Sequence, residues 1–274
     1  MAGGILKHFI SICLAHLLAA LLFALPAAAE PQRIVSLDAC ADQYVLGLAP
    51  LAHVVAVSDR ATLPESWFRD RVGAIRKVKP KLETILALRP DAVVRTWGGD
   101  AKLLQALQLY GVKVININEV STYSAAKDEL FRVGHEMNED ASASIEAHNF
   151  DDAMDGIRDI GHGRTVLYYT PSGYTAGPDT MQGDMLRKLG FRLETQDKGY
   201  AYLSPEVLLS LKPDVFALGF YDDRYAMRRV PGRNPLVRAA IARTRHFTIP
   251  ARALACNGWY TVYDLENLSL RGVP

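Results

Sequence analysis

The sequence predicts an α/β fold built from two related halves, because one short sequence segment occurs twice in the chain. The copies occupy residues 83–94 and 206–216. Each places a carboxylate at the start of a Leu-rich helix, stops that helix with a basic residue and Pro, and leads through an Asp into a strand. Both strand segments are apolar without alternation, which is typical of parallel strands covered on both faces. We therefore expect two Rossmann-like lobes with mainly parallel sheets.

Strands and helices alternate through the first half, which favours a parallel sheet wrapped by helices. The expected elements are a strand at 33–37 that ends at Asp38, a helix at 41–49 closed by Pro50, a strand at 53–57, the first copy of the repeat, a helix at 101–110 stopped by Gly111, and a fourth strand at 112–117.

Residues 124–160 have apolar side chains at helical intervals and no convincing strand. Two helices are expected here, and the second, at 141–160, would run about 30 Å if it were fully helical. Such a bridge predicts a stiff pair of lobes with small closing motions, whereas a linker rich in Gly, Pro and Ser would let the lobes swing widely.

The second half repeats the order of elements. It is expected to contain a strand at 164–169, a turn-rich loop at 170–178, a helix at 181–189 stopped by Gly190, the second copy of the repeat and a last strand at 246–249. The predicted divisions are a signal peptide at 1–29, an N-terminal lobe at 30–138, a linking helix at 139–162 and a C-terminal lobe at 163–274, with a ligand cleft between the lobes.

The N-terminus has the pattern of an export signal. Lys7 precedes an apolar stretch at 9–25, and small residues at 27–29 form a cleavage site. A membrane anchor is the weaker alternative, because the stretch is short, contains His16 and lacks a basic stop-transfer segment. We expect a soluble periplasmic protein that is cleaved near Ala29.

The charge balance and the cysteines limit the possible partners and the possible cross-links of the protein. The chain has 31 Lys and Arg against 30 Asp and Glu, a balance that offers no general attraction to nucleic acid or anionic lipid. Cys40 and Cys256 remain after signal removal, and an oxidising compartment would permit a disulfide between them. Lone cysteines in a parallel fold are also often small buried hydrophobes, so the sequence leaves both alternatives open.

Ligand-binding residues are expected in the loops at the carboxyl ends of the strands, where open α/β sheets bind ligands. The candidates are Asp38, Arg95, Trp97, Tyr169, Tyr174, Phe220, Tyr221, Arg224, Trp259 and Tyr260. Aromatic faces with a few guanidinium groups suit a large, planar, partly anionic ligand. Several of the rings are equally compatible with an ordinary core, and we expect about half of them to contact ligand.

Signatures of catalysis are mostly absent from the sequence. It contains no Gly-x-Ser-x-Gly elbow, Walker loop or His-Glu-x-x-His helix, and the histidines after the signal are dispersed. We expect neither catalytic residues nor a metal site, and the chain is predicted to be a binding protein without a cofactor of its own rather than an enzyme.

Several segments taken together resemble one family. They are residues 33–42 (RIVSLDACAD), 82–91 (LETILALRPD), 97–99 (WGG), 111–114 (GVKV), 204–209 (SPEVLL) and 212–214 (KPD). The resemblance is to periplasmic substrate-binding proteins of the iron-siderophore and cobalamin class, the class III proteins with a helical backbone, which deliver ligand to ABC importers. It covers nearly the whole chain after the signal.

This resemblance implies two lobes joined by one long helix, a monomer, and permease subunits in the membrane as partners. It also implies that Glu83 and Glu206 each present a carboxylate to arginines of the permease. The alternative is that both carboxylates simply favour a helix N-terminus, worth about 0.3–1 kcal/mol. The two roles are compatible.

The identity of the ligand stays open at this stage. Trp97 and the Tyr-rich second half resemble cobalamin carriers, whereas Arg95, Arg224, Arg228, Arg229 and Arg233 would favour a more acidic ligand unless those at 228–233 are solvated surface. Ferric siderophores and pyrroloquinoline quinone both fit. Haem carriers of the class use a Tyr as iron ligand, for which Tyr169 and Tyr174 are the candidates. An exported enzyme or metallochaperone that acts on such a ligand is the alternative from another class, and a sensor domain is a weaker third.

Overall fold

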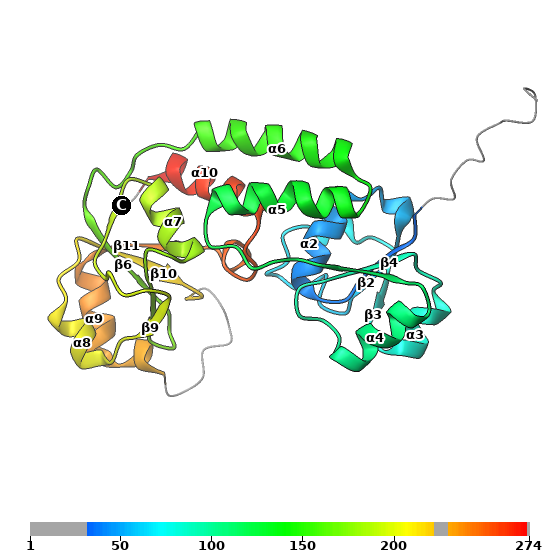
Figure 1. Cartoon of the computed structure of the whole chain (residues 1–274). Coiled ribbons are helices and arrows are strands. Elements are labelled where there is room, and N and C mark those ends of the chain that lie inside the picture. Colours follow the sequence, from blue (N-terminus) through cyan, green and yellow to red (C-terminus); the bar gives the residue numbers. More distant parts are fainter. Residues whose placement is uncertain (1–31, 222–229, 273–274) are drawn as a thin grey trace, which may run out of the picture. The chain divides into compact units, whose positions relative to one another are not determined.

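Two parallel β-sheets organise residues 32–221 and 230–272, the part of the chain that the structure, a computed structural model, describes (Figure 1). These residues belong to one compact unit, so their division into two lobes stays a prediction. The predicted signal peptide at 1–29 lies outside them. None of the described helices is long and apolar enough to cross a membrane.

The first sheet has five parallel strands with β1 at its centre. In spatial order they are β3 (Arg76–Val78), β2 (Val54–Ser58), β1 (Ile34–Ser36), β4 (Ala92–Arg95) and β5 (Lys113–Asn116). β1 pairs with both β2 and β4, with Val35 opposite Val93. Because β1 and β4 are parallel neighbours, the segments that follow them, which contain Asp38 and Trp97, leave the sheet side by side.

The second sheet repeats this arrangement with four parallel strands. In spatial order they are β11 (Arg245–Ile249), β10 (Val215–Gly219), β6 (Thr165–Tyr169) and β8 (Arg192–Leu193). β6 lies between β10 and β8 in the same way that β1 lies between β4 and β2. A separate antiparallel pair, β7 (Tyr174–Ala176) and β9 (Tyr200–Tyr202), stands beside β6.

Helices connect and cover the strands. They are α2 (Ala39–Leu48), α3 (Leu82–Ala87), α4 (Ala101–Leu109), α5 (Tyr123–Glu136), α6 (Asp140–Asp155), α7 (Met181–Lys188), α8 (Pro205–Ser210), α9 (Pro235–Arg243) and α10 (Val262–Arg271), with 3₁₀ turns η1 (Leu51–His53), η2 (Arg69–Arg71), η3 (Pro231–Arg233), η4 (Ala251–Ala253) and η5 (Trp259–Thr261). Polar side chains cap many of the starts, as Asp100 does for α4 and Thr122 for α5.

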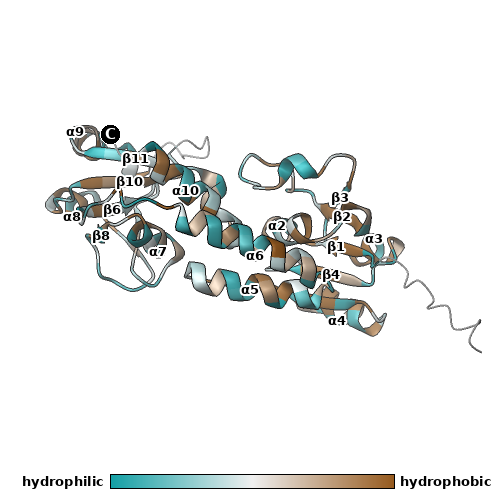
Figure 2. Cartoon of the chain, turned by 90° about the horizontal axis from the view of Figure 1, so that it is seen from above, coloured by the Kyte–Doolittle hydropathy of each residue, from teal (hydrophilic) through white to brown (hydrophobic). Residues whose placement is uncertain are grey.

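Successive strand residues face different hydrophobic layers. In β1, Ile34 belongs to the main core and Val35 to a second cluster beneath α3 and α4. A third cluster lies between the second sheet and the helices α8 and α9. The main core contains Val94 of the first sheet and Val215 of the second, so it runs from one half of the chain to the other. Figure 2 shows β2 and β10 as largely hydrophobic, as strands covered on both faces must be.

The repeated Asp of the sequence performs the same task in both halves. The backbone N–H of Arg33, just before β1, donates to Asp91 Oδ2 at 2.7 Å, and that of Thr165, at the start of β6, donates to Asp214 Oδ2 at 2.8 Å. Asp91 thus links the start of β4 to the neighbouring strand β1, and Asp214 links the start of β10 to the neighbouring strand β6. The α/β fold with mainly parallel sheets is confirmed, and the repeat is visible in its hydrogen bonds.

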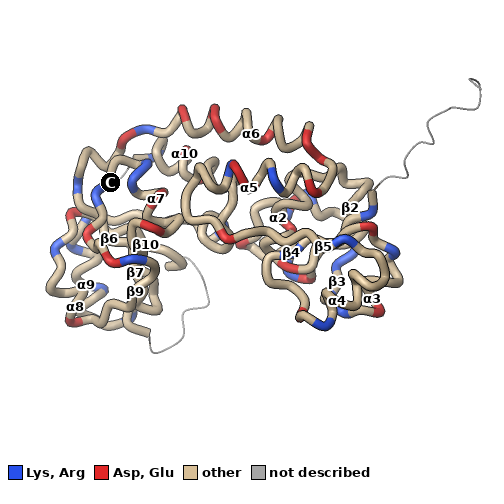
Figure 3. Tube along the Cα trace, viewed as in Figure 1, with Lys and Arg blue, Asp and Glu red and all other residues tan. Residues whose placement is uncertain are grey.

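Short or polar elements are the ones that sequence patterns did not predict. β3 contains Arg76 and Lys77, which are exposed, and therefore lacks the apolar run of a buried strand. The helix expected at 141–160 ends at Asp155, before Gly156, so α6 is about 24 Å long. Beyond it, the N–H groups of Ile160 and Gly161 donate to the carbonyl of Leu189 instead of continuing the helix. Figure 3 shows acidic residues along α6, which has no Lys or Arg.

Asp42 is a carboxylate buried on α2. The backbone N–H of Ser58 donates to its Oδ1 at 2.9 Å, and the Ser58 hydroxyl donates to its Oδ2 at 2.5 Å. Burial raises the pKa of Asp42 from 3.8 to about 6, although the bonds from Ser58 act in the opposite direction. The folded protein therefore binds this proton more tightly than the unfolded chain does.

Asp42→Asn should raise the stability at neutral pH. The stabilisation that protonated Asp42 provides is complete below about pH 4 and is lost as the pH rises through about 6. Asn keeps an acceptor for the Ser58 N–H and offers a donor to its hydroxyl, so we expect the variant to be about 2 kcal/mol more stable than the wild type above pH 7 and equal to it near pH 4. Urea unfolding from pH 4 to pH 8 measures this, and a difference that is constant across that range contradicts the raised pKa.

Candidate functional site

Asp38 follows β1 and caps helix α2. Its backbone is extended, and its Oδ1 accepts hydrogen bonds from the N–H groups of Cys40 at 3.1 Å and Ala41 at 2.9 Å. These are donors of the first helical turn, which have no partner inside the helix. One oxygen of the carboxylate thus starts α2.

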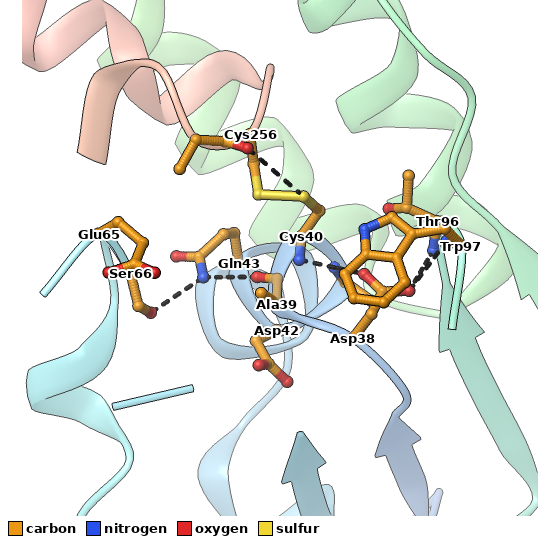
Figure 4. The surroundings of a disulfide bond; sticks show 12 residues. Asp38, Ala39, Cys40, Asp42, Gln43, Glu65, Ser66, Thr96, Trp97 and Cys256 are labelled. Carbon is orange, nitrogen blue, oxygen red and sulfur yellow. Dashed lines mark hydrogen bonds between the residues drawn. A yellow bond between two sulfur atoms is a disulfide. The ribbon is translucent and has the colours of Figure 1, made fainter. Parts of the chain in front are cut away.

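The other oxygen of Asp38 holds the loop that follows β4 (Figure 4). Oδ2 accepts from the N–H groups of Thr96 at 2.8 Å, Trp97 at 3.0 Å and Gly98 at 2.7 Å. The loop lies so close to the end of β1 that a Cβ at residue 98 would come within 2.5 Å of the Leu37 carbonyl oxygen, so glycine is required there. One side chain therefore fixes both segments at the carboxyl ends of the two central strands.

The structure corrects the predicted role of Asp38. The residue is 1% exposed, and its carboxylate already accepts five backbone hydrogen bonds. A carboxylate offers about four lone-pair directions, so it has no capacity left for a ligand. Asp38 instead fixes the backbone at Trp97.

Trp97 is the exposed aromatic residue at the centre of the site. It is 53% exposed, although its backbone N–H is held by Asp38. The guanidinium of Arg60 lies 6.0 Å from the ring centroid. Three cavities, described below, all include Trp97 in their lining.

Two of these cavities share one wall. The first, the Arg60 cavity, has a volume of about 410 Å³ and the second, the Tyr44 cavity, about 550 Å³, both within the usual range of small-molecule sites. The residues common to both are Cys40, Trp97, Leu254, Ala255 and Cys256. The Arg60 cavity adds Gln43, Arg60, Glu65, Ser66 and Phe220, and the Tyr44 cavity adds Tyr44, Thr96, Asn118, Glu119, Tyr200 and Asn257.

A disulfide forms part of that common wall. It joins Cys40 of α2 to Cys256, which follows β11, with 5.4 Å between the Cα atoms (Figure 4). The alternative that the sequence left open, two separate thiols, is not what the structure contains. Closing so long a loop stabilises a fold by about 3–5 kcal/mol.

The second half of the chain supplies Phe220 and Tyr200 to the cavities. Phe220 follows β10 and adopts a left-handed backbone with φ of 59°, and Tyr200 lies on β9. Tyr200 and Tyr202 were not predicted as site residues, although their spacing in a strand puts both on one face. Tyr202 is paired with Tyr174 across the β7–β9 ribbon, with ring centroids 5.8 Å apart.

Trp259 and Tyr260, predicted to contact ligand, are core residues instead. They are 0% and 1% exposed. The Trp259 ring packs edge-on against Tyr44 with 4.8 Å between centroids, and its Nε1 donates to Glu146 at 3.2 Å. The Tyr260 hydroxyl donates to the Cys256 carbonyl at 3.1 Å. Both rings support the disulfide segment from behind, because this segment folds back onto the helices of the main core.

Tyr169 and Tyr221 lie away from the Trp97 cavities. Tyr169 is fully buried under the second sheet and Tyr221 packs against the same cluster, and neither hydroxyl has a partner among the described residues. Burial raises the pKa of Tyr169 to about 12, with a smaller contribution from Tyr202. Tyr174 is 47% exposed and also lies outside the lining of these cavities.

Neither Arg95 nor Arg233, the two predicted arginines within the described residues, lines the cavities beside Trp97. Arg95 ends β4, is half-buried, and its Nε has no hydrogen-bond partner within the described part of the chain. Arg224, Arg228 and Arg229 lie outside the described residues, and Arg233 ends η3. Arg60, which the sequence did not single out, lines one cavity beside Trp97, 3.9 Å from Glu65, and Lys81 and Lys102 line the groove on the side of Glu83.

Helical spacing could have identified further cavity residues. Cys40, Gln43 and Tyr44 are three and four residues apart on α2, so they share one face of the helix. Gln43 is held by Ser66, whose hydroxyl accepts from its Nε2 at 3.0 Å. Among the described residues, no group of three or more His, Cys, Asp and Glu is arranged to hold a metal ion.

Glu83 and Glu206 occupy the same position in equivalent helices. Each is the second residue of a six-residue helix, α3 or α8, that precedes β4 or β10. The Ser204 side chain lowers the pKa of Glu206 through a hydrogen bond. A groove of about 740 Å³ runs from Glu83 past Asp100 to Trp97, so the carboxylate and the exposed ring border one hollow.

The chain matches the family described as periplasmic binding protein over residues 34–219. A cobalamin-binding protein of Halobacterium salinarum is 27% identical over 205 residues, which cover 71% of this chain and 56% of that protein. The chain thus spans little more than half the length of this relative.

Solved structures show the same fold. A possible iron-binding, periplasmic solute-binding protein of Staphylococcus epidermidis aligns with a TM-score of 0.67 at 20% identity, over 87% of this chain and 97% of that one. The periplasmic heme-binding protein HutB of Vibrio cholerae aligns with a TM-score of 0.68 at 19% identity, over 88% and 99%. At this level of identity the likeness is one of fold.

Asp38→Asn and Asp100→Asn form a matched pair that separates the two tasks of Asp38. Asn caps helices as well as Asp does, so Asp100→Asn, which involves one bond to the Leu103 N–H, should change the stability by less than about 0.5 kcal/mol. At residue 38 the new amide group would face N–H donors, and we expect a loss of roughly 1.5–3 kcal/mol. Urea unfolding measures both. Equal effects of the two substitutions would mean that the bonds to residues 96–98 are unimportant.

Proposed function

Because this chain belongs to the periplasmic binding protein family, we propose that it is an exported carrier of a large, partly anionic cofactor or metal chelate. The ligand would be of the cobalamin or ferric-siderophore type. The protein would deliver it to an ABC importer. The signal peptide at 1–29 would direct export and be removed near Ala29. The mature protein would act as a monomer.

One observation carries the proposal: a half-exposed Trp97 lines three adjoining cavities and is held in place by a buried carboxylate. An exposed indole costs free energy in water unless something covers it. Asp38 fixes the backbone at Trp97, so little backbone entropy is lost when a flat ligand stacks on the ring. A pre-organised aromatic platform is what a carrier of planar chelates needs.

Phe220 and Tyr200 come from the second half of the chain and line the two cavities that also contain Trp97. A ligand in these cavities would contact both halves. This supports the organisation into an N-terminal lobe at 30–138, a linking segment at 139–162 whose helix α6 spans Asp140–Asp155, and a C-terminal lobe at 163–274, with closure of the lobes around the cargo.

Glu83 and Glu206 are proposed to contact the permease. Equivalent carboxylates on equivalent helices support a partner that recognises both halves in the same way. The groove between Glu83 and Trp97 offers a short route by which docking at the first carboxylate could reach the ligand platform.

Trp97→Ala should weaken ligand binding by about tenfold or more, since the ring contact and its buried area are worth about 1.5–3 kcal/mol. Tyr110→Ala is the matched control, because Tyr110 is an exposed ring (69%) at the end of α4 and outside the cavity linings. The measurement is the absorption spectrum and mass of whatever co-purifies, followed by titration. The absorption spectrum distinguishes a corrin, a ferric chelate, a haem and a quinone. Release of a chemically altered ligand would instead indicate an enzyme. Unchanged binding in Trp97→Ala places the site elsewhere.

The double variant Glu83→Arg with Glu206→Arg should retain ligand affinity and lose import, because it places cations against the permease arginines. Asp128→Arg with Asp155→Arg makes the same change of charge on exposed residues of α5 and α6 and should import normally. Uptake of ligand by cells that carry the importer is the readout. Equal uptake with the wild type and the first double variant would refute the docking role.

A further inference from the structure

Two residues that line the Tyr44 cavity have buried hydroxyl groups without a hydrogen-bond partner among the described residues. Tyr44 is 1% exposed, and neither its hydroxyl nor the Thr96 Oγ1 meets a donor or acceptor within the described residues. Both residues line the same 550 Å³ cavity. A buried polar group is nearly always paired, and one left unpaired reduces the stability of the fold. Two such groups on residues that line one cavity leave hydrogen-bonding capacity that an occupant of the cavity can complete.

The surroundings keep both hydroxyls in place. The Tyr44 ring is packed against Trp259, and the Thr96 backbone is tied to Asp38 through its N–H group at 2.8 Å. Burial raises the pKa of Tyr44 well above its usual value, and the nearby Glu129 acts in the same direction. Tyr44 is therefore a neutral phenol that can both donate and accept.

The cavity is also lined by two side-chain amides, each of which donates one hydrogen bond outside it. Asn118 donates through Nδ2 to Glu129 at 3.2 Å, and Asn257 donates through Nδ2 to the Val120 carbonyl at 3.0 Å. Each amide keeps its oxygen as an acceptor. Two hydroxyls and two amide oxygens in one hollow match the donors and acceptors of a primary amide or an alcohol.

The charged residues of the Tyr44 cavity differ from those of the Arg60 cavity, which shares Trp97 with it. The described residues that line the Tyr44 cavity include no Lys or Arg, and Glu119 is its charged member. The Arg60 cavity has a guanidinium, 51% exposed and near the Trp97 ring. Glu65 lines the Arg60 cavity as well, 3.9 Å from the guanidinium, so a carboxylate or phosphate would have to compete with Glu65 for Arg60 there, whereas on the Tyr44 side it would meet no basic residue among those described.

We infer that the Tyr44 cavity is a subsite for an uncharged, hydrogen-bonding substituent of the cargo, an amide or a hydroxyl, and that Tyr44 and Thr96 determine this specificity. This inference rests on the proposed function. It narrows the cargo to chelates with peripheral amides or hydroxyls and orients them, with any anionic group toward Arg60. A ligand without such a substituent would leave both hydroxyls unpaired, which is a strong basis for rejection.

The test uses Tyr44→Phe, Thr96→Val and their combination, which remove the hydroxyls and keep the shapes. Tyr123→Phe is the control, because Tyr123 is equally buried on the neighbouring α5 but does not line the cavity. The probes are cyanocobalamin and ferrioxamine B, which carry amides, and hemin, which carries carboxylates and no amide. Thermal melting of each variant shows whether it is folded.

We expect an amide-bearing probe to bind the wild type, to bind Tyr44→Phe and Thr96→Val about tenfold more weakly, and to bind Tyr123→Phe with unchanged affinity. Wild-type affinity in the double variant, or tighter binding of hemin than of both amide-bearing probes, overturns the subsite and leaves the carrier function standing. If none of the three probes binds the wild type, the proposed function itself fails.

Discussion

The carboxylate of Asp38 is the interaction on which the candidate site depends. Two backbone donors of α2 and three of the loop after β4 meet on its two oxygens. A single charged acceptor thus sets where the helix begins and where the loop lies, and both choices determine the position of Trp97. Hydrogen bonds to a charged acceptor are stronger than neutral ones, so a short loop can hold the backbone from which the Trp97 ring projects.

The other side of the site is assembled from the end of the chain. The segment after β11 returns to the helix α2, where the disulfide between Cys40 and Cys256 joins it covalently. Trp259 and Tyr260 fill the space behind this bond with buried aromatic surface. The two rings serve the site from within the core, because they fix the wall that both cavities share.

The chemistry of the site differs on the two sides of Trp97. Arg60 brings a cation to one side, whereas the other side presents hydroxyls and amides without a basic residue among those described. Under the proposed function, this difference would make both the orientation and the affinity of a bound ligand depend on individual side chains.

Local patterns in the sequence were sufficient for the α/β class, the internal repeat and the parallel strands, because unbroken apolar runs and helix stops depend on neighbours along the chain. They also pointed to Trp97 and Phe220. Tertiary structure alone decided that Trp259 and Tyr260 are buried, that the cysteines are bonded, and that Arg60 lines a cavity beside Trp97. Burial and pairing of this kind depend on residues far apart in the sequence, such as Cys40 and Cys256, which only the folded chain brings together.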